Sequence, residues 1–253
     1  MNVRKSFVGI GMLCLFTVAA SAEWERTISA WDTRLPAEKK LQLSLWGDYW
    51  AWEDSGAKGH SIDGRLYLNY GLMDNWSLAV SPGYSYWHMN GLGSENGIGD
   101  TSLMSTYRFL DEAKAGFDLA AWGEAWFPTG NDNRSLGTGH VEPGIGLIAS
   151  KTLGPIIAVA NLGGNVIINA DQGENDVIAE ATLEGVYPLC ETLSLNAQVS
   201  AATKRWNDED ALIDLGLGTR FKPVEQVFLA GAAYKCLTDN YNYGFQIGGG
   251  YEF

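Results

Sequence analysis

Histidine is the side chain with the widest chemical repertoire in this sequence, and there are three: His60, His88 and His140. Imidazoles gathered at one level of a fold can bind a metal ion, but these three have neither helical nor paired-ligand spacing, so we expect no metal site. Ser85 and His88 offer a second chemistry, because a serine–histidine pair oriented by an acid or amide can hydrolyse a lipid. The two residues have opposite parity in an extended chain, and no third partner is implied. We therefore expect no catalytic residue and no cofactor.

A second group of side chains suits binding rather than reaction. Trp46, Trp50, Trp122 and Trp126 form two pairs, each with a spacing of four residues, so both members of a pair share one face of a strand. Indole rings that face a channel can stack on aromatic solutes. The alternatives are that these rings pack around an N-terminal leader or an inward-folded loop, or that the strand register shifts locally.

The first residues form a targeting segment. Arg4 and Lys5 precede an apolar run over residues 7–20, and Ala20-Ser21-Ala22 is a small-residue cleavage signal. We therefore expect a signal peptide over residues 1–22, a periplasmic leader over 23–39 and one large domain over 40–253.

Charge excludes one class of partner. Without residues 1–22 the chain has 15 Lys and Arg against 30 Asp and Glu, a formal net charge of −15. Proteins that bind nucleic acid present a basic face, so we expect no nucleic-acid partner. Two cysteines remain, Cys190 and Cys236, and the expected strand map puts them near opposite ends of the domain, too far apart for a disulfide.

Residues 240–253 alternate strictly between apolar and polar or small side chains. The odd positions from Tyr241 to Phe253 are apolar except for Gly249, with aromatic rings at both ends. Period two with aromatic ends is typical of a strand that crosses a membrane between two interfaces. A closing strand that ends in Phe253 resembles the last strand of bacterial outer-membrane barrels, whose assembly machinery recognises that end.

The same alternation recurs along the chain and predicts twelve strands, although it is weaker in the sixth, seventh and eleventh. Longer polar loops, including residues 53–60 and a Gly-rich loop over 90–100, alternate with short turns, as in up-and-down barrels with extracellular loops and periplasmic turns. An even number of strands leaves both termini on the periplasmic side. The expected strands cover residues 40–52, 61–72, 76–87, 101–109, 117–127, 140–151, 156–170, 177–187, 193–204, 211–221, 226–236 and 240–253.

Two faces of opposite polarity require a closed sheet if the strands lie in lipid. Every backbone N–H and C=O in hydrocarbon must pair within the protein, and strands achieve this only in a barrel. The apolar faces would then meet lipid, while charged residues point inward. A two-sided hydrophobic strand such as residues 156–160 also fits a soluble β-sandwich, which does not predict the alternation of loop lengths. The predicted lumen-lining residues are Asp48, Asp63, Arg65, Arg108, Asp118, Glu124, Glu180, Glu184, Lys204, Asp214, Arg220 and Glu252.

Short motifs in residues 97–151 resemble a known family. They are Gly97-Ile98-Gly99-Asp100, then Tyr107-Arg108-Phe109, then Phe127-Pro128-Thr129-Gly130, then Leu136-Gly137-Thr138-Gly139, then Ser150-Lys151. In order and spacing this segment resembles the outer-membrane transporters named after the meta-pathway of phenol degradation. The resemblance implies a barrel that passes small compounds, often hydrophobic or aromatic.

The sequence thus predicts an all-β chain: a transmembrane up-and-down antiparallel β-barrel of about twelve strands in the bacterial outer membrane. The expected function is passive passage of small solutes, and the expected partners are outer-membrane lipid, the solute and the barrel-assembly machinery. The alternatives are a rim-acting lipid enzyme and a plugged structural or adhesive barrel.

Overall fold

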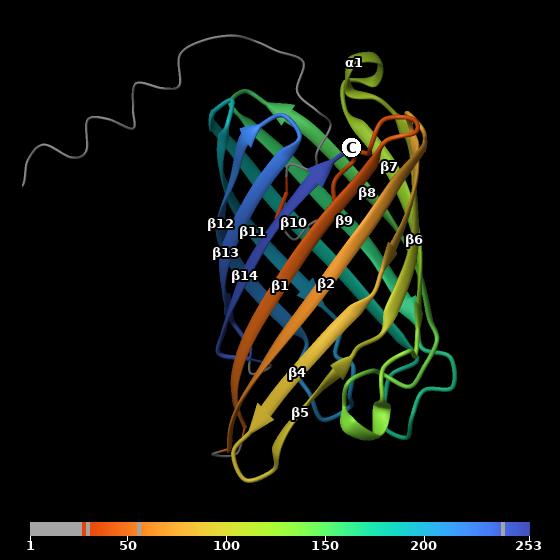
Figure 1. Cartoon of the computed structure of the whole chain (residues 1–253), viewed down its shortest axis with the longest axis vertical. Coiled ribbons are helices and arrows are strands. Elements are labelled where there is room, and N and C mark those ends of the chain that lie inside the picture. Colours follow the sequence, from red (N-terminus) through yellow and green to blue (C-terminus); the bar gives the residue numbers. More distant parts are fainter. Residues whose placement is uncertain (1–26, 29–30, 55–56, 239–240) are drawn as a thin grey trace, which may run out of the picture.

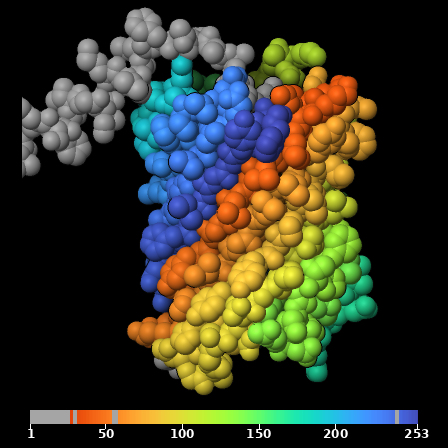
Figure 2. Space-filling model, in the orientation of Figure 1, coloured from red at the N-terminus to blue at the C-terminus, as the bar shows by residue number. Residues whose placement is uncertain are grey.

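Period-two alternation gives each strand an apolar and a polar face, and the computed structural model shows these strands closed into an antiparallel barrel (Figure 1). It describes residues 27–28, 31–54, 57–238 and 241–253. Closure occurs at β1 (Leu41–Asp54), which pairs with β2 (Ala57–Met73) on one side and β14 (Tyr243–Glu252) on the other. Figure 2 shows the wall continuous where the C-terminal strands meet the first two.

The other elements follow one another around the barrel. Only neighbours in sequence pair, apart from the contact of β1 with β14 and the two divided crossings described next. Among the described residues, no helix is long and apolar enough to cross a membrane. The elements are β3 (Trp76–Ser81), β4 (Gly83–Met89), β5 (Gly93–Ile98), β6 (Thr101–Leu110), α1 (Glu112–Ala115), β7 (Asp118–Phe127), η1 (Asp132–Arg134), β8 (Glu142–Leu153), β9 (Ile156–Val166), β10 (Val177–Cys190), β11 (Leu193–Ala202), β12 (Leu212–Val224) and β13 (Val227–Cys236).

Fourteen labelled strands make twelve crossings, because two crossings are divided. β3 and β4 both pair with β2 and are separated by Pro82, which has no N–H to donate. The facing crossing is divided between β5 and β6 at Gly99 and Asp100. Two bonds bridge the gap, from Leu66 N to Pro82 O (3.2 Å) and from Gly99 N to Gly83 O (2.9 Å). The predicted twelve-stranded barrel is confirmed.

Two of the predicted loops are wrong in extent. Residues 53–60 were expected to form a loop, but β1 and β2 extend into this range and leave only a short connection, of which residues 55–56 lie outside the described part of the chain. The Gly-rich loop over residues 90–100 contains β5. The β4–β5 hairpin projects beyond the barrel wall in Figure 1, and one side of it packs against the loop after β7, where Arg134 pairs with Glu95 and Leu136 lies beside Gly97. Gly93–Ile98 therefore pairs as a strand without an apolar alternation.

The barrel has two ends, named here by the chain segments they carry. The proximal rim carries the C-terminus and α1, and the distal rim carries the β4–β5 hairpin and η1 (Figure 1). Between the rims the outward face is apolar, with Ile145, Leu217 and Ile247 at least 70% exposed. The inward face buries charge, since Glu184 and Arg220 are at most 3% exposed. No disulfide joins the two cysteines in the described part of the chain, as predicted.

The described part of the leader lies inside the barrel at its proximal end. Ile28 N donates to Glu184 Oε1 on β10 (3.0 Å), and the Thr33 hydroxyl donates to Asp118 Oδ2 on β7 (3.2 Å). Arg220 on β12 donates to the carbonyl of Thr27 (2.6 Å). Because these partners lie on separate parts of the wall, the segment crosses the lumen instead of covering one side.

Gly146 and Gly163 make room for the Trp122 indole on the inner wall. A Cβ at either position would overlap both the indole and a neighbouring backbone carbonyl. We therefore expect Gly146→Ala and Gly163→Ala each to lower the free energy of unfolding by about 1–3 kcal/mol, as overpacking does elsewhere. Urea unfolding in detergent, followed by heat-modifiable gel mobility, measures this change.

Gly123→Ala is the matched control. A Cβ there would lie 3.9 Å from the nearest atom, the carbonyl oxygen of Gly144, so stability should change by less than about 0.5 kcal/mol. Equal effects of all three substitutions would show that the tryptophan contact is not the cause.

Candidate functional site

The lumen is the candidate site, and the charged residues predicted to line it divide by location. Eleven of the twelve lie within strands, whereas Lys204 lies just beyond β11 and donates to the carbonyl of Asn207 (2.7 Å). Near the proximal rim, Glu252 accepts a hydrogen bond from Gln42 (2.8 Å), and Arg108 donates to the carbonyl of Asp74 (3.3 Å). Lys204 and Arg108 thus bond to loop and turn carbonyls at the two rims.

Deeper charges contact the leader or their neighbours on the wall. Glu184, Asp118 and Arg220 bond to leader residues, and Glu184 Oε1 also accepts from the Asn196 amide (2.6 Å). Asp63 accepts a bond from the Ser85 hydroxyl (2.7 Å). The side chains at these predicted lumen positions therefore form hydrogen bonds with other parts of the same chain.

Other carboxylates have an oxygen without a hydrogen-bond partner among the described residues. One oxygen each of Asp48, Glu124 and Asp214 is buried and has no hydrogen-bond partner among the described residues. Glu180 is exposed, on the same strand face as Glu184. Buried polar atoms without a protein partner require water, so we expect ordered water beside these carboxylates.

The four inward tryptophans are covered to different degrees. Trp46 is buried against Ile28 of the leader and Phe228 of β13, with 5.7 Å between the two ring centroids. Trp122 is buried in a second cluster, against which Trp31 of the leader packs. Packing around the leader, one of the alternatives to solute stacking, therefore describes the surroundings of Trp46 and Trp122.

The other two tryptophans lie nearer the distal half. Trp50 contacts the rings of Tyr234 and Tyr241, at centroid distances of 5.6 and 4.8 Å. Trp126 lies under the Arg65 guanidinium, whose central carbon is 4.2 Å from the ring centroid. This distance is typical of a cation–π contact.

Two cavities lie in series along the lumen. The proximal cavity, of about 120 Å³, is bounded by leader residues Ile28, Trp31 and Leu35 and by wall residues that include Trp46 and Asp48. The distal cavity, of about 410 Å³, is lined by wall and loop residues that include Trp126 and Leu136. Arg65 lines both cavities, so the Arg65–Trp126 contact lies at their junction.

Asp100 organises the loop that narrows the distal cavity. Its carboxylate accepts bonds from the backbone N–H of Gly130 (3.0 Å) and of Thr138 (2.7 Å), and Gly137 packs directly against it. The motifs at residues 97–100, 127–130 and 136–139, noted in the sequence for their order, thus meet in space. Their glycines permit close approach, and their aspartate satisfies the loop backbone.

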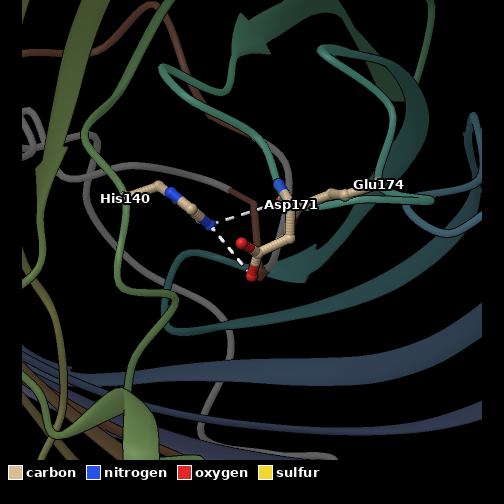
Figure 3. A group of neighbouring side chains, drawn as sticks. All are labelled: His140, Asp171 and Glu174. Atoms are coloured by element: carbon tan, nitrogen blue, oxygen red, sulfur yellow. Dashed lines mark hydrogen bonds and ion pairs between the residues drawn. The ribbon is translucent and has the colours of Figure 1, made fainter.

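A charged cluster connects three loops at the distal rim. Arg205 donates to Glu142 Oε1 (2.6 Å) and to Glu174 Oε1 (2.7 Å). Burial alone would lower the pKa of the Arg205 guanidinium, but hydrogen bonds and charge from the two carboxylates raise it. His140 lies beside Glu174 and Asp171 (Figure 3). No sequence pattern indicated this grouping, because its members come from three separate segments, residues 140–142, residues 171–174 and Arg205.

The serine and histidines considered for lipid hydrolysis are not brought together. The Ser85 hydroxyl donates to Asp63 in the lumen, whereas the His88 ring bonds to Asn90 (3.2 Å). His88 instead lies beside His60 on the paired strand, with ring centroids 5.4 Å apart. The three histidines therefore divide into this pair and His140 in its separate cluster.

The closed wall, apolar outside and charged inside, has the form of a bacterial outer-membrane β-barrel, and solved structures share it. The COG4313 outer membrane channel from Pseudomonas putida F1 is 20% identical, with a TM-score of 0.73 over 89% of this chain and 100% of the channel. The KdgM porin is 8% identical, with a TM-score of 0.59 over 84% of this chain and 99% of the porin.

The same fold also occurs outside channels. The beta domain of the Bordetella autotransporter BrkA is 12% identical, with a TM-score of 0.58 over 85% of this chain and 100% of that domain. Neither a protein-family model nor a curated protein sequence matches the chain. Function must therefore be argued from the lumen itself.

Arg205 should matter more to stability than an exposed arginine does. Arg205→Met leaves Glu142 and Glu174 buried without their cation, and we expect a loss of about 2–3 kcal/mol in the free energy of unfolding. Arg134→Met is the control, since the ion pair of Arg134 with Glu95 is exposed and should contribute under about 1 kcal/mol. Urea unfolding in detergent measures both, and equal losses would contradict the assigned role of Arg205.

Proposed function

We propose that this protein is an outer-membrane channel for passive passage of small solutes, closed in this conformation by its own N-terminal leader. The observation that carries the proposal is a pair of cavities in series within a hydrated lumen, separated by one cation–π contact and bounded proximally by the leader. In the described lumen the Ser85 hydroxyl bonds to Asp63, and the His88 ring bonds to Asn90 instead of to this serine. We expect the lumen to select solutes by size, charge and surface.

The leader must move for solutes to pass. The proximal cavity of about 120 Å³ is smaller than typical small-molecule sites, which measure about 300–1,000 Å³. Leader contacts form much of its boundary, so displacement of the leader would join this cavity to the proximal side. A solute that enters from the distal rim is expected to reach the distal cavity first.

The lining favours small amphiphilic solutes, including aromatic ones. Apolar surfaces of Trp46, Tyr67, Met104 and Phe228 adjoin the Asp48 carboxylate in the proximal cavity. Aromatic side chains that face a water-filled passage can stack against planar solutes. The resemblance to the phenol meta-pathway transporters points the same way.

Membrane placement is part of the proposal. The apolar outer face contacts outer-membrane lipid, the proximal rim faces the periplasm, and we place both termini on that side of the membrane. The final strand ends at Glu252, and the N–H of the next residue, Phe253, bonds to the carbonyl of Leu41 (2.8 Å); this end is offered to the barrel-assembly machinery. The distal loops then lie outside the cell.

A plugged structural barrel is the second candidate, because the leader fills the proximal lumen. Conductance in planar bilayers separates the two. We expect the intact protein to open rarely, and a variant that lacks residues 27–36 to show larger and more frequent conductance steps. The milder Ile28→Ala/Trp31→Ala variant, which removes leader side chains without shortening the chain, should lie between them.

Heat-modifiable gel mobility must first show that each variant is folded. A folded deletion variant that stays silent would rule out the channel proposal and favour the structural role.

Arg65 should influence ion preference. The predicted lumen residues comprise eight acids and four bases, so we expect cation preference in the open channel. Arg65→Ala removes the cation at the junction of the cavities and should strengthen that preference, measured as a shift in reversal potential under a salt gradient. Lys235→Ala is the control, because Lys235 is exposed and donates to the carbonyl of Asn242. An unchanged reversal potential for Arg65→Ala would exclude the junction from the conducting path.

A further inference from the structure

His140, Asp171 and Glu174 converge at the distal rim from two separate loops. His140 precedes β8, while Asp171 and Glu174 lie in the connection from β9 to β10. Figure 3 shows the imidazole directed at the two carboxylates. Its Nε2 lies 3.6 Å from Asp171 Oδ2 and 3.4 Å from Glu174 Oε2, and all three ligand atoms lie within 4.8 Å of one another.

These separations suit a shared ion better than direct hydrogen bonds. N–H···O bonds span about 2.7–3.2 Å, so neither contact of the imidazole is a good one. Ligands about 2.0–2.2 Å from a tetrahedral zinc ion lie about 3.3–3.6 Å from one another. Both distances from His140 fall at this tetrahedral edge length. We propose that His140, Asp171 and Glu174 form a binding site for a divalent first-row transition-metal ion such as Zn²⁺.

The least exposed ligand is already oriented for this role. The Glu174 side chain is 1% exposed, and its Oε1 is held by Arg205 Nε at 2.7 Å. Its Oε2 accepts the backbone N–H of Asp171 (3.0 Å) and faces His140. Such outer contacts fix ligand orientation in metal sites. Little rearrangement is therefore needed for binding.

The local charge also favours a dication. The cluster contains three carboxylates, those of Glu142, Asp171 and Glu174, and one guanidinium, that of Arg205, so it carries about −2 when the imidazole is neutral. One divalent ion balances that charge. An imidazole ligand selects zinc and its neighbours over calcium or magnesium, which prefer oxygen alone. The fourth position of the tetrahedron is open to water.

Binding would couple two loops at the channel mouth. The loop over residues 128–140 lines the distal cavity through Leu136, Gly137 and Thr138. An ion held by His140, Asp171 and Glu174 would fasten its end to the β9–β10 connection. The inference does not depend on conduction, because metal binding can be measured in detergent with no channel assay.

The test must remove a competing site. His60 and His88 face each other across a strand pair and could bind metal on their own. Titration of Zn²⁺ into the full-length His60→Ala/His88→Ala protein, purified from membranes, should give one ion per chain by calorimetry. Adding His140→Ala or Asp171→Asn should weaken this binding at least tenfold, and Ca²⁺ should not compete.

Asp171→Asn keeps the test independent of folding, since the Asp171 side chain is 72% exposed. Zn²⁺ should also slow proteolysis of the distal loops in the protein with Asp171 and not in the Asp171→Asn variant. Zinc affinity unchanged by both His140→Ala and Asp171→Asn would overturn the proposal, as would the absence of zinc binding to the His60→Ala/His88→Ala protein.

Discussion

Pairing of every backbone group within the wall is the constraint on which the rest of this structure depends. Ten residue pairs join β1 to β14 and remove the last sheet edges, since lipid cannot satisfy an exposed N–H or C=O. Even Pro82, which cannot donate, is accommodated by bonds from the strands on either side. Closure then gives the chain two surfaces with different solvents, and the alternation in the sequence follows from that difference.

Closure also creates an interior that must be filled or hydrated. Large inward rings are set against glycines, as Trp122 is against Gly146 and Gly163, which narrows the lumen without crowding the wall. The leader fills much of the remaining proximal space. Twelve strands fall between small barrels filled by side chains and wide porins, and this protein combines packing at one end with a cavity at the other.

The sequence predicted the features that follow from the alternation of apolar and polar residues along a strand. It did not predict the features that this alternation does not determine. Strand number, closure and the inward parity of Trp46 and Trp122 follow from alternation across the hydrocarbon. The extent of β5 does not, because Gly93–Ile98 has no apolar alternation and its Glu95 pairs with Arg134 of the loop after β7. The leader position could not be predicted either: Ile28 bonds to Glu184, 156 residues away, and no local pattern encodes that contact.

The distal loops likewise contain one feature that the sequence indicated and one that it did not. The glycine motifs around Asp100 were visible because a close backbone approach restricts residue type locally. The cluster of His140, Asp171 and Glu174 was not visible, because its geometry arises only when the β9–β10 connection folds against the loop before β8. Residues joined by loop packing carry no periodic signal, so the sequence supported the expectation that the histidines are unrelated to a metal site.

The contacts of the leader indicate how it can both close the lumen and release it. Glu184, Asp118 and Arg220 hold it through hydrogen bonds to backbone and hydroxyl groups, and its apolar anchors are Ile28, Trp31, Leu35 and Pro36. Hydrogen bonds to charged groups contribute about 1.5–3 kcal/mol each, and water in the lumen can replace these partners. The apolar leader side chains add resistance to release in proportion to the area that they bury. A short segment with a few replaceable polar contacts and a small apolar area fits the gate proposed above.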